Sequence, residues 1–370
     1  MAGCPCPYLG YRTTSTDALC VLTGIPPIKI SIKNNTLLHL VTKENETILI
    51  DNEELDESSF MTKLKTYNFP DYNKLTNLNI IEENTKFKHC AITIFTDGSR
   101  MEDGTSAAFV VYKENIEIFT HQIKLNEKNS IYQAELIAIQ QALNWIRNYN
   151  HNHFLIYTDS ESSVKALQRL FPQNEIIKRI YEKILEMPDK TIHIKWTKSH
   201  VGTLGNERAD YLAKQVIREN KFDQQISLKY PISYLKKYIK NKIITDWQEY
   251  WNTSEKGRDT YNVLRQVNRD YLCRDQVVTY FISGHGSFPS YLYKIKRRDS
   301  DLCVCGKKGN PFHYLFEDCS ITRTKFNFNR DKSVRENMKE VLHNPKYLKN
   351  LYNIYNTLNK FYSYVNYIFK

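Results

Sequence analysis

The sequence lacks long apolar runs. None of its 370 residues belongs to a stretch approaching the length of about 20 apolar residues that spans a bilayer. The first residues, MAGCPCPYLGYRTTST, contain no apolar core of signal-peptide length. These absences argue against integral membrane and secreted proteins. The sequence therefore predicts no membrane partner and an intracellular location, nuclear or cytoplasmic.

Cysteine is also scarce. The eight cysteines are mostly isolated and do not form the dense pattern of a secreted disulfide framework. One group differs, because Cys303, Cys305, His313 and Cys319 follow a C-x-C-x7-H-x5-C arrangement. Three thiolates and an imidazole suit a tetrahedral Zn²⁺ ion, although the first spacing is tighter than the common two residues. The alternative is a set of buried, reduced cysteines.

The chain is basic. Lysine and arginine number 52 against 41 acidic residues, so the formal net charge is +11. A basic excess favours polyanionic partners, nucleic acid before anionic membrane. A solubilising surface explains the same charge, and so does the amino-acid usage of an AT-rich genome. Charge alone therefore leaves the partner open.

Changes in residue pattern and composition along the sequence predict three regions. Residues 1–88 contain a short helix, TSTDALCVLTG, with Ser15 or Thr16 as its N-cap and Gly24 at its end, followed by a polar connecting region. Residues 89–220 hold alternating strands and helices. Residues 221–370 are mostly helical in pattern, rich in aromatic residues, and carry the Cys/His cluster.

The middle region predicts an α/β fold with a mixed five-stranded sheet flanked by helices. The expected strands are 91–97, 107–112, 116–125, 154–159 and 191–199, and the expected helices are 130–148, 162–171, 174–187 and 206–220. Short turns between the first three strands indicate an antiparallel meander, whereas the intervening helices indicate that the last two strands join in parallel.

Acidic residues occupy unusual places in this region. Asp97 in IFTDGS and Asp159 in IYTDSE end apolar strands, and strand alternation puts Asp97 on the same side as Phe95. Glu135 falls on the apolar stripe of a helix that should face the sheet. Asp210 follows Asn206, the expected N-cap of the last helix. Taken singly, each acid is ordinary, since most are solvated and strand-ending aspartates often form turns.

Together these acids predict a metal site. Four like charges cannot share a pocket without cations between them, and hard oxygen ligands select Mg²⁺ or Mn²⁺. A pair of such ions roughly 4 Å apart is a common device for attack on a phosphodiester. The pattern thus favours a phosphodiester-cleaving enzyme.

Four ordered motifs carry a family resemblance. FTDGS, YQAELIAIQQAL, IYTDSESS and KWTKSHVGTLGNERADYLAK resemble the successive motifs of type 1 ribonuclease H, most closely the form fused to reverse transcriptases of non-LTR retrotransposons. The resemblance covers residues 89–220. It implies that Asp97, Glu135, Asp159 and Asp210 bind two Mg²⁺ (or Mn²⁺) ions, and that His200 assists proton transfer or product release.

The resemblance also implies a reaction and a partner. The reaction is endonucleolytic hydrolysis of the RNA strand of an RNA–DNA hybrid, without a small-molecule cofactor. Nucleic-acid contacts are expected at Gly98, Ser99, Gln133 and Asn206. The segment NEKNSIYQAE departs from the paired-asparagine segment usual in cellular enzymes, and no tryptophan-rich basic insertion follows Asp159. These departures predict weak hybrid binding by the isolated domain.

The flanking segments resemble the same elements. GYRTTSTDALCVLTGIPPI is similar to their link between polymerase and ribonuclease, and a GHG segment at 284–286 precedes the Cys/His cluster, as it does in them. This supports one Zn²⁺ ion at the cluster. The sequence has no Asp-Asp pair of the kind a polymerase palm needs. We therefore expect a C-terminal fragment without the polymerase.

Two other functions remain open at this point. The first is a retrotransposon relic that binds nucleic acid through its basic surface without efficient turnover. The second is a DNA-directed relative, an integrase or exonuclease with the same sheet. Nothing in the sequence indicates an oligomeric state.

Overall fold

The structure is a computed structural model and divides into two compact units. One comprises residues 1–37 and 239–370, and the other residues 38–238. The residues described are 11, 13–50, 52–61, 63–64, 75–81, 92–169, 174–198, 203–269, 275–317, 319–322, 332, 336–337, 340 and 344–363. Within these ranges no helix is both long and apolar enough to cross a membrane. The predicted boundaries at 88 and 220 stay a prediction.

A seven-stranded mixed sheet forms the centre of the 38–238 unit. Its strand order is β10-β7-β6-β5-β8-β9-β4. The strands are β4 (Leu78–Ile81), β5 (Ile92–Met101), β6 (Gly104–Lys113), β7 (Ile116–Leu125), β8 (His153–Thr158), β9 (Thr191–Trp196) and β10 (Gln224–Gln225). β5, β6 and β7 form an antiparallel meander, and β8 and β9 join in parallel. The predicted α/β class and mixed sheet are confirmed.

The predicted count of five strands omits two at the edges. β4 pairs in parallel with β9, and β10 pairs in parallel with β7. β10 is only two residues long, and both residues are exposed. A strand as short as β10 forms by backbone pairing to an edge that already exists, so it leaves no apolar alternation in the sequence. In β4, Leu78 and Ile80 do pack against the core, but four residues are too few to predict a strand.

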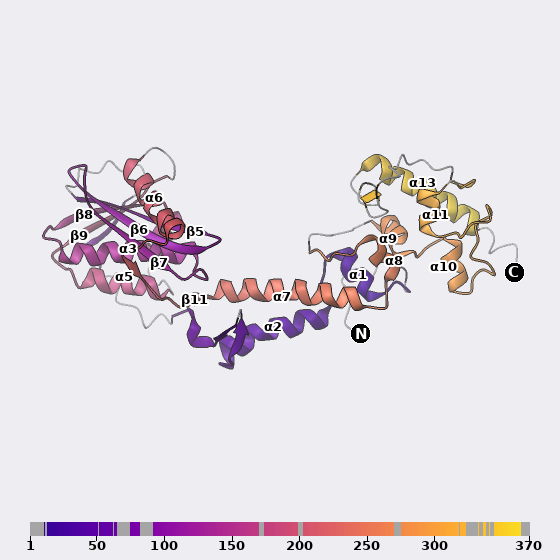
Figure 1. Ribbon diagram of the computed structural model, residues 1–370, viewed down its shortest axis with the longest axis horizontal. Coiled ribbons are helices and arrows are strands. Elements are labelled where there is room, and N and C mark those ends of the chain that lie inside the picture. The colour runs from indigo at the N-terminus through magenta and orange to yellow at the C-terminus, as the bar shows by residue number, and fades with distance from the viewer. Residues whose placement is uncertain are drawn as a thin grey trace. The chain divides into compact units, whose positions relative to one another are not determined.

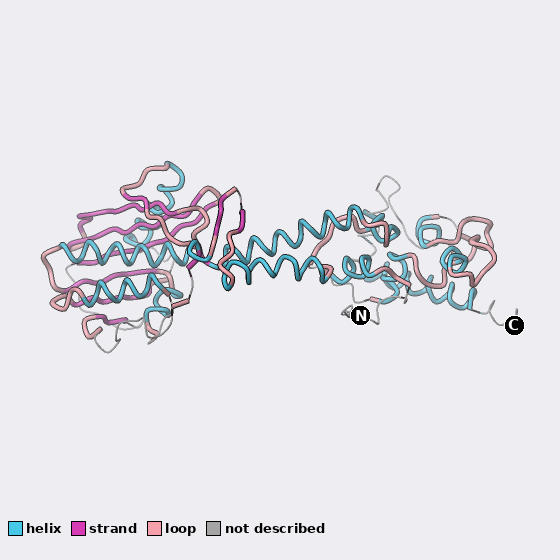
Figure 2. The backbone as a smooth tube through the Cα atoms, turned by 90° about the horizontal axis from the view of Figure 1, so that it is seen from below, coloured by secondary structure: helices cyan, strands magenta, loops and turns pink. Residues whose placement is uncertain are grey.

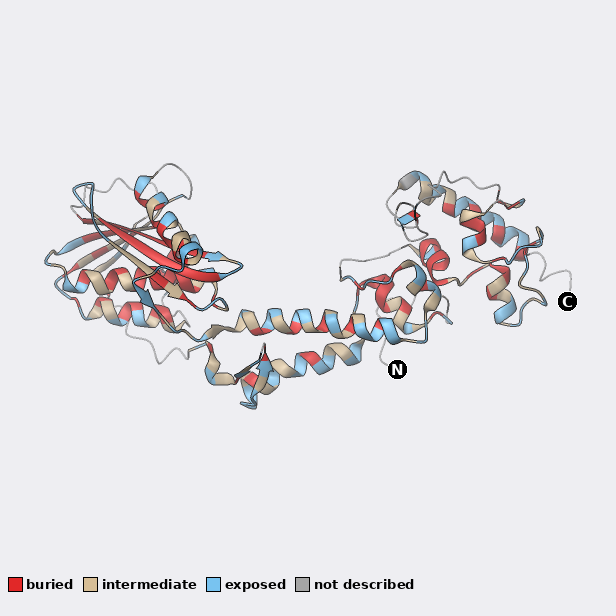
Figure 3. Cartoon of the chain, in the orientation of Figure 1, coloured by how far each residue is buried: buried red, intermediate tan, exposed pale blue. Residues whose placement is uncertain are grey.

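Helices cover both faces of the sheet. α3 (Ile131–Asn148) and α5 (Glu175–Leu185) lie side by side on one face, and α6 (Leu204–Glu219) covers the other (Figures 1 and 2). The larger core lies under α3 and α5, and a smaller one under α6 contains Phe95, Ala209 and Leu212. The burial colours of Figure 3 show the central strands and the inner side of α3 buried.

Strand alternation on β5 places its side chains as predicted. Ile92 and Ile94 belong to the core under α3, whereas Phe95 belongs to the core under α6 and stacks on Tyr157 at 4.9 Å between ring centroids. Asp97, two residues after Phe95, therefore points to the α6 side of the strand. Asp97 thus comes from the α6 side of β5, whereas Glu135 comes from α3 on the other face of the sheet.

The start of α6 differs from the prediction. The helix begins at Leu204 with Thr203 as its N-cap, so Asn206 lies inside the first turn and is not the cap. Gly205 explains the shift. A Cβ on Gly205 would lie 2.3 Å from the Phe95 ring, so this glycine lets the helix begin in contact with the sheet. Sequence rules treat such a glycine as a break, and tertiary packing overrides them here.

The remaining elements of this unit are short. They are β1 (Ile48–Ile50) paired with β2 (Glu53–Leu55), the 3-10 helix η1 (Glu57–Ser59), β3 (Phe60–Met61) paired with β11 (Tyr230–Pro231), and α4 (Glu161–Leu167). Two helices contain the boundaries between the units: α2 (Ile28–Lys43) and α7 (Ile232–Thr253).

The other unit is helical, as predicted. Its first helix, α1 (Thr16–Thr23), has Ser15 as N-cap and Gly24 as C-cap, which confirms that part of the sequence reading. The other helices are α8 (Arg258–Val263), α9 (Gln276–Ser283), α10 (Pro289–Lys294), α11 (Pro311–Phe316) and α13 (Pro345–Ser363). Their core is aromatic and includes Trp247, Trp251 and Tyr314.

Candidate active site

Three carboxylates from separate elements meet at one end of the sheet. Asp97 lies on β5, Glu135 in the first turns of α3, and Asp159 directly after β8. One oxygen atom of each lies within 4.8 Å of the others. Asp97 is 5% exposed and Glu135 7%. Carboxylates far apart in the sequence are thus gathered into one acidic cluster, as their strand-end and stripe positions predicted.

Gly98 allows α3 to approach the strand this closely. A Cβ on Gly98 would lie 2.6 Å from the backbone nitrogen of Glu135 and 3.0 Å from the Cβ of Ala134. The helix start itself is fixed by a capping box in which Ser130 and Gln133 bond reciprocally to each other's backbone. Glycine at 98 therefore sets the distance between Glu135 and Asp97.

We expect Gly98→Ala to damage both stability and the site. The added methyl group forces the α3 backbone away from β5, which costs about 1–3 kcal/mol of unfolding free energy. A shift of about 1 Å in Glu135 should lower any activity on the order of 10²-fold. Gly104→Ala is the matched control, since its Cβ would meet only Ile217 at 3.7 Å. Equal melting temperatures for the two variants would contradict this role.

Burial and mutual repulsion shape the protonation of these acids. Burial, with the charges of Asp159 and Asp210, raises the pKa of Asp97 to about 7 against the opposing charge of Lys214. Burial and the charges of Asp97 and Asp159 raise the pKa of Glu135 well above its usual range, although the Gly98 N–H donates to its carboxylate and acts in the opposite direction. The cluster strongly disfavours its own negative charge.

The same atoms fit a divalent cation. Oδ2 of Asp97 and Oε2 of Glu135 are buried and have no hydrogen-bond partner in the part of the chain that the structure describes. Burying a carboxylate oxygen costs free energy unless a cation or a hydrogen-bond donor contacts it. Hard oxygen donors of this kind match Mg²⁺ and Mn²⁺.

The structure also shows what holds the acids. The Asn206 carboxamide donates to Oδ2 of Asp159 at 3.3 Å, and the Trp196 indole N–H donates to the Asp159 backbone carbonyl at 3.0 Å. Asp210 lies outside the group of three and pairs with Lys214 at 2.7 Å. Sequence reasoning missed Lys214 and Trp196. Only Lys214 had a signal, its i+4 spacing from Asp210 on a helix.

Three of the side chains predicted to contact nucleic acid are buried. Gln133 is 2% exposed, and its carboxamide is used by the Ser130 and Lys229 backbones. Ser99 and Asn206 are also buried. Gln133 and Asn206 thus make contacts within the domain, and the roles of Gly98, Ser99, Gln133 and Asn206 toward nucleic acid stay a prediction. His200 lies outside the described residues.

The raised pKa values predict how stability depends on pH without magnesium. Because Asp97 has a higher pKa folded than unfolded, the folded chain keeps a proton that the unfolded chain has released. The free energy of unfolding should therefore fall as pH rises from about 4 to about 7, by a few kcal/mol. Melting temperatures across this range test it. The decline should be shallower in Asp97→Asn, and Mg²⁺ should restore stability at pH 7.5. Parallel curves for the two proteins would contradict it.

The Cys/His cluster forms a second possible metal site in the helical unit. One ligand atom each of Cys303, Cys305, His313 and Cys319 lies within 4.8 Å of the others. The Sγ atoms of Cys303 and Cys319 are 3.7 Å apart, and Cys305 Sγ is 3.2 Å from His313 Nε2. A tetrahedral zinc ion with Zn–S bonds of about 2.3 Å places its sulfur atoms roughly 3.7 Å apart.

The surroundings of this cluster also fit a metal. His313 Nδ1 lies 3.1 Å from a Glu317 carboxylate oxygen, so Nε2 is left to face the thiols. Burial tends to raise the pKa of Cys303, but the Cys305 backbone N–H, with the Tyr314 and Tyr362 hydroxyls, lowers it to about 6. The short C-x-C spacing is accommodated by a tight turn at Gly306, whose φ is +85°.

Comparison with known proteins places the acidic site in a family. Residues 89–218 match the family model described as RNase H. They form a ribonuclease H domain. The match includes Asp97, Glu135, Asp159 and Asp210, and it ends two residues before the predicted boundary at 220.

Curated relatives of the chain include retrotransposon polyproteins and a ribonuclease H. Two are retrovirus-related Pol polyproteins from type-1 retrotransposable elements. The one from element R1 of Bradysia coprophila is 26% identical, and the alignment covers 24% of this chain and 9% of that protein. The one from element R1 2 of Nasonia vitripennis is 28% identical, and the alignment covers 24% of this chain and 22% of that protein. Ribonuclease H of Saccharomyces cerevisiae is 23% identical over 57% of this chain and 71% of its own length. The chain spans less than a quarter of the two polyproteins.

Solved structures include a similar chain. RNase H1 from the halophilic archaeon Halobacterium salinarum NRC-1 is 17% identical, and the alignment covers 35% of this chain and 98% of that one with a TM-score of 0.29.

Proposed function

We propose that this protein hydrolyses the RNA strand of RNA–DNA hybrids. The observation that carries the proposal is the convergence of Asp97, Glu135 and Asp159, with two buried oxygens that lack partners among the described residues. The family match of residues 89–218 and the similarity to a yeast ribonuclease H support the same reaction class. The similarity to R1 polyproteins supports an origin in a non-LTR retrotransposon.

The acidic residues have distinct places in this proposal. Asp97 would contribute to both of two divalent-cation sites, Glu135 and Asp159 to one of them, and Asp210 to the other. Two Mg²⁺ ions, when bound, supply the positive charge that phosphodiester hydrolysis requires at the attacking and leaving oxygens. Asn206 and Trp196 orient Asp159. Lys214 holds Asp210 and partly offsets the charge around Asp97.

We also propose that the Cys/His cluster binds one Zn²⁺ ion. Its sulfur spacing and the Glu317–His313 contact support this assignment. Such an ion would be structural, because all four ligands come from the protein and leave no open coordination position.

A cleavage assay tests the main proposal. The purified full chain is incubated with Mg²⁺ and a labelled RNA–DNA hybrid, duplex RNA or duplex DNA. We expect cuts only in the RNA strand of the hybrid. Binding without cleavage, equal with and without metal, would identify a relic. Cleavage of duplex DNA would identify a DNA-directed enzyme instead.

A further inference from the structure

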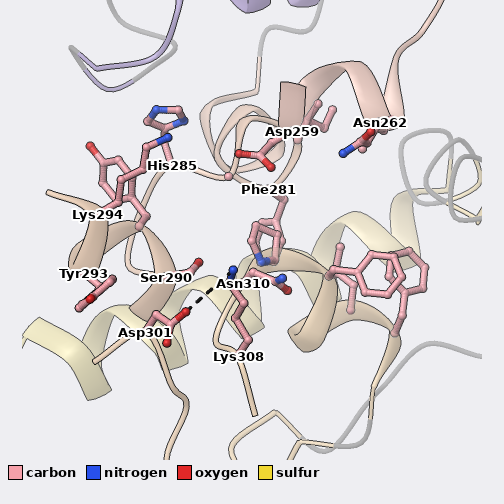
Figure 4. Close-up of a pocket in the computed structure, with 18 of the residues that line it drawn as sticks. Asp259, Asn262, Phe281, His285, Ser290, Tyr293, Lys294, Asp301, Lys308 and Asn310 are labelled. Carbon is pink, nitrogen blue, oxygen red and sulfur yellow. Dashed lines mark ion pairs between the residues drawn. The ribbon is translucent and has the colours of Figure 1, made fainter. Parts of the chain in front are cut away.

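The helical unit contains a cavity of about 1060 Å³ among α8, α9, α10 and α11 (Figure 4). Aromatic rings such as Phe281 and Phe312 line it together with charged groups of both signs. Two of these charged residues, Asp301 and Lys308, form an ion pair at 3.9 Å, which Figure 4 marks with a dashed line. This mixed lining favours no single class of ligand.

A more specific arrangement lies in the other unit, around the loop that precedes α3. Lys128 in this loop bonds to the Glu53 carboxylate of β2, and its side chain is only 11% exposed. Tyr230 of β11 donates its hydroxyl to the same carboxylate at 2.8 Å. The Lys128 ammonium also lies 5.5 Å from the centre of the Tyr230 ring and 5.6 Å from that of Tyr234. One carboxylate and two aromatic rings thus surround this cation, and both kinds of group attract it.

Two buried carboxamides after Lys128 extend this contact to α3. Asn129 and Gln133 each donate to the Lys229 backbone carbonyl, at 3.3 and 2.9 Å. Oε1 of Gln133 also accepts from the Ser130 backbone N–H at 3.0 Å, as part of the capping box of α3. Because one carbonyl accepts from both carboxamides, the segment before β11 is tied to the first turn of the helix that carries Glu135.

The segments that make these contacts lie outside the ribonuclease H match of residues 89–218. β11 pairs in parallel with β3, and the rings of Phe60 and Tyr230 lie 6.4 Å apart between centroids. Met61 and Leu228 pack against the core under α3. Segments on both sides of the domain in sequence are therefore anchored to its core and meet at the loop before α3.

We propose that these flanking segments form a clamp that positions Glu135 for cation binding, with Lys128 as the positioning residue that they hold. The clamp consists of Glu53, Lys229 and Tyr230. In the metal-free site the three clustered carboxylates repel one another, so the start of α3 needs a firm anchor to keep Glu135 among them. The inference rests on the proposed function, because it assigns Glu135 to a cation site.

Lys128→Met tests the clamp, since methionine keeps an apolar side chain beside the aromatic rings but loses the bond to Glu53. Calorimetric titration of the full chain should show the Mg²⁺ dissociation constant rising about tenfold, because a residue that orients a metal ligand has lost its partner. Single-turnover cleavage of labelled hybrid should slow by a similar factor. Hydrogen exchange should become faster at the start of α3 and stay unchanged in its last two turns.

Other variants make the test specific. Lys124→Met is the matched control, because Lys124 also bonds to a side-chain oxygen and lies over a ring, those of Asn220 and Phe222, but away from α3. It should leave all three measurements unchanged. Lys128→Arg keeps the charge and should keep most of the Mg²⁺ affinity. Glu53→Gln should reproduce the effect of Lys128→Met and add nothing to it in the double variant, because both changes remove one contact.

The outcomes separate the clamp from the proposed activity. Unchanged Mg²⁺ affinity in folded Lys128→Met would overturn the clamp, even with a lower melting temperature, since that combination identifies a purely structural contact. Unchanged hydrogen exchange at the start of α3 would overturn it as well. A wild-type chain that cuts no hybrid would refute the proposed function alone, because Mg²⁺ affinity and exchange still decide the clamp. Tyr230→Phe, which removes only a hydroxyl, takes the place of Lys128→Met if that variant does not fold.

Discussion

Asp97→Asn should abolish hybrid cleavage while leaving the protein folded and more stable. The variant keeps the size of the side chain but removes a charge that lies close to both Glu135 and Asp159. Loss of a carboxylate that holds catalytic cations should lower the rate on the order of 10³-fold or more. Stability should rise because the pKa of Asp97, raised to about 7, records an unfavourable buried charge at neutral pH.

Single-turnover cleavage of labelled hybrid and a thermal melt at pH 7.5 without magnesium measure the two effects. Asp103→Asn is the control, since Asp103 is exposed in the turn between β5 and β6. A variant that kept a tenth of the wild-type rate would contradict the role of Asp97. A lowered melting temperature would contradict only the electrostatic explanation of the higher stability. The assignment of Asp97 to the active site would stand.

Removal of zinc should unfold much of the helical unit. Structural zinc ions contribute apparent binding free energies of about 10–16 kcal/mol in small peptides, comparable with the whole stability of a domain. Cys303 and Cys319 lie in the core of this unit, so the cluster is part of its packing. We expect one zinc ion per purified chain by atomic emission, and a marked loss of helical circular dichroism on chelation.

Cys305→Ser is the informative variant, because Cys305 is only partly buried and its loss disturbs packing least. It should reduce zinc content and the melting temperature together. Cys20→Ser changes a buried cysteine outside the cluster and should keep the zinc. Acidification should also release zinc, because protons compete with the metal for the thiolates and the imidazole. If the purified protein contained no metal and chelators left its melting temperature unchanged, the cluster would be a set of buried, reduced cysteines.

Much of the acidic site was predictable from local patterns. Asp97 and Asp159 follow apolar strands, and Glu135 interrupts the apolar stripe of α3, so alternation and helical periodicity alone assign each a direction. The Cys/His spacing similarly predicted four ligands that the structure brings within 4.8 Å. These features are local because a side chain's direction follows from its place in one element.

Other features depended on contacts that no local pattern contains. The Gln133 carboxamide caps α3, and the Asn206 carboxamide donates to Asp159. Neither contact could be predicted from the sequence, because a carboxamide can bond to many partners and only the folded neighbours select one. The edge strands β4 and β10 likewise follow from the presence of a finished sheet.

By itself the sequence determined the α/β class, the directions of the acids and the Cys/His ligand set, because these depend on periodicity and spacing along one chain segment. The tertiary structure alone decided that α6 begins at Leu204 against Phe95 and that Lys214 pairs with Asp210 beside the other acids. The physical reason is that close packing selects among conformations and partners that are nearly equal in energy locally, and such packing joins residues distant in sequence.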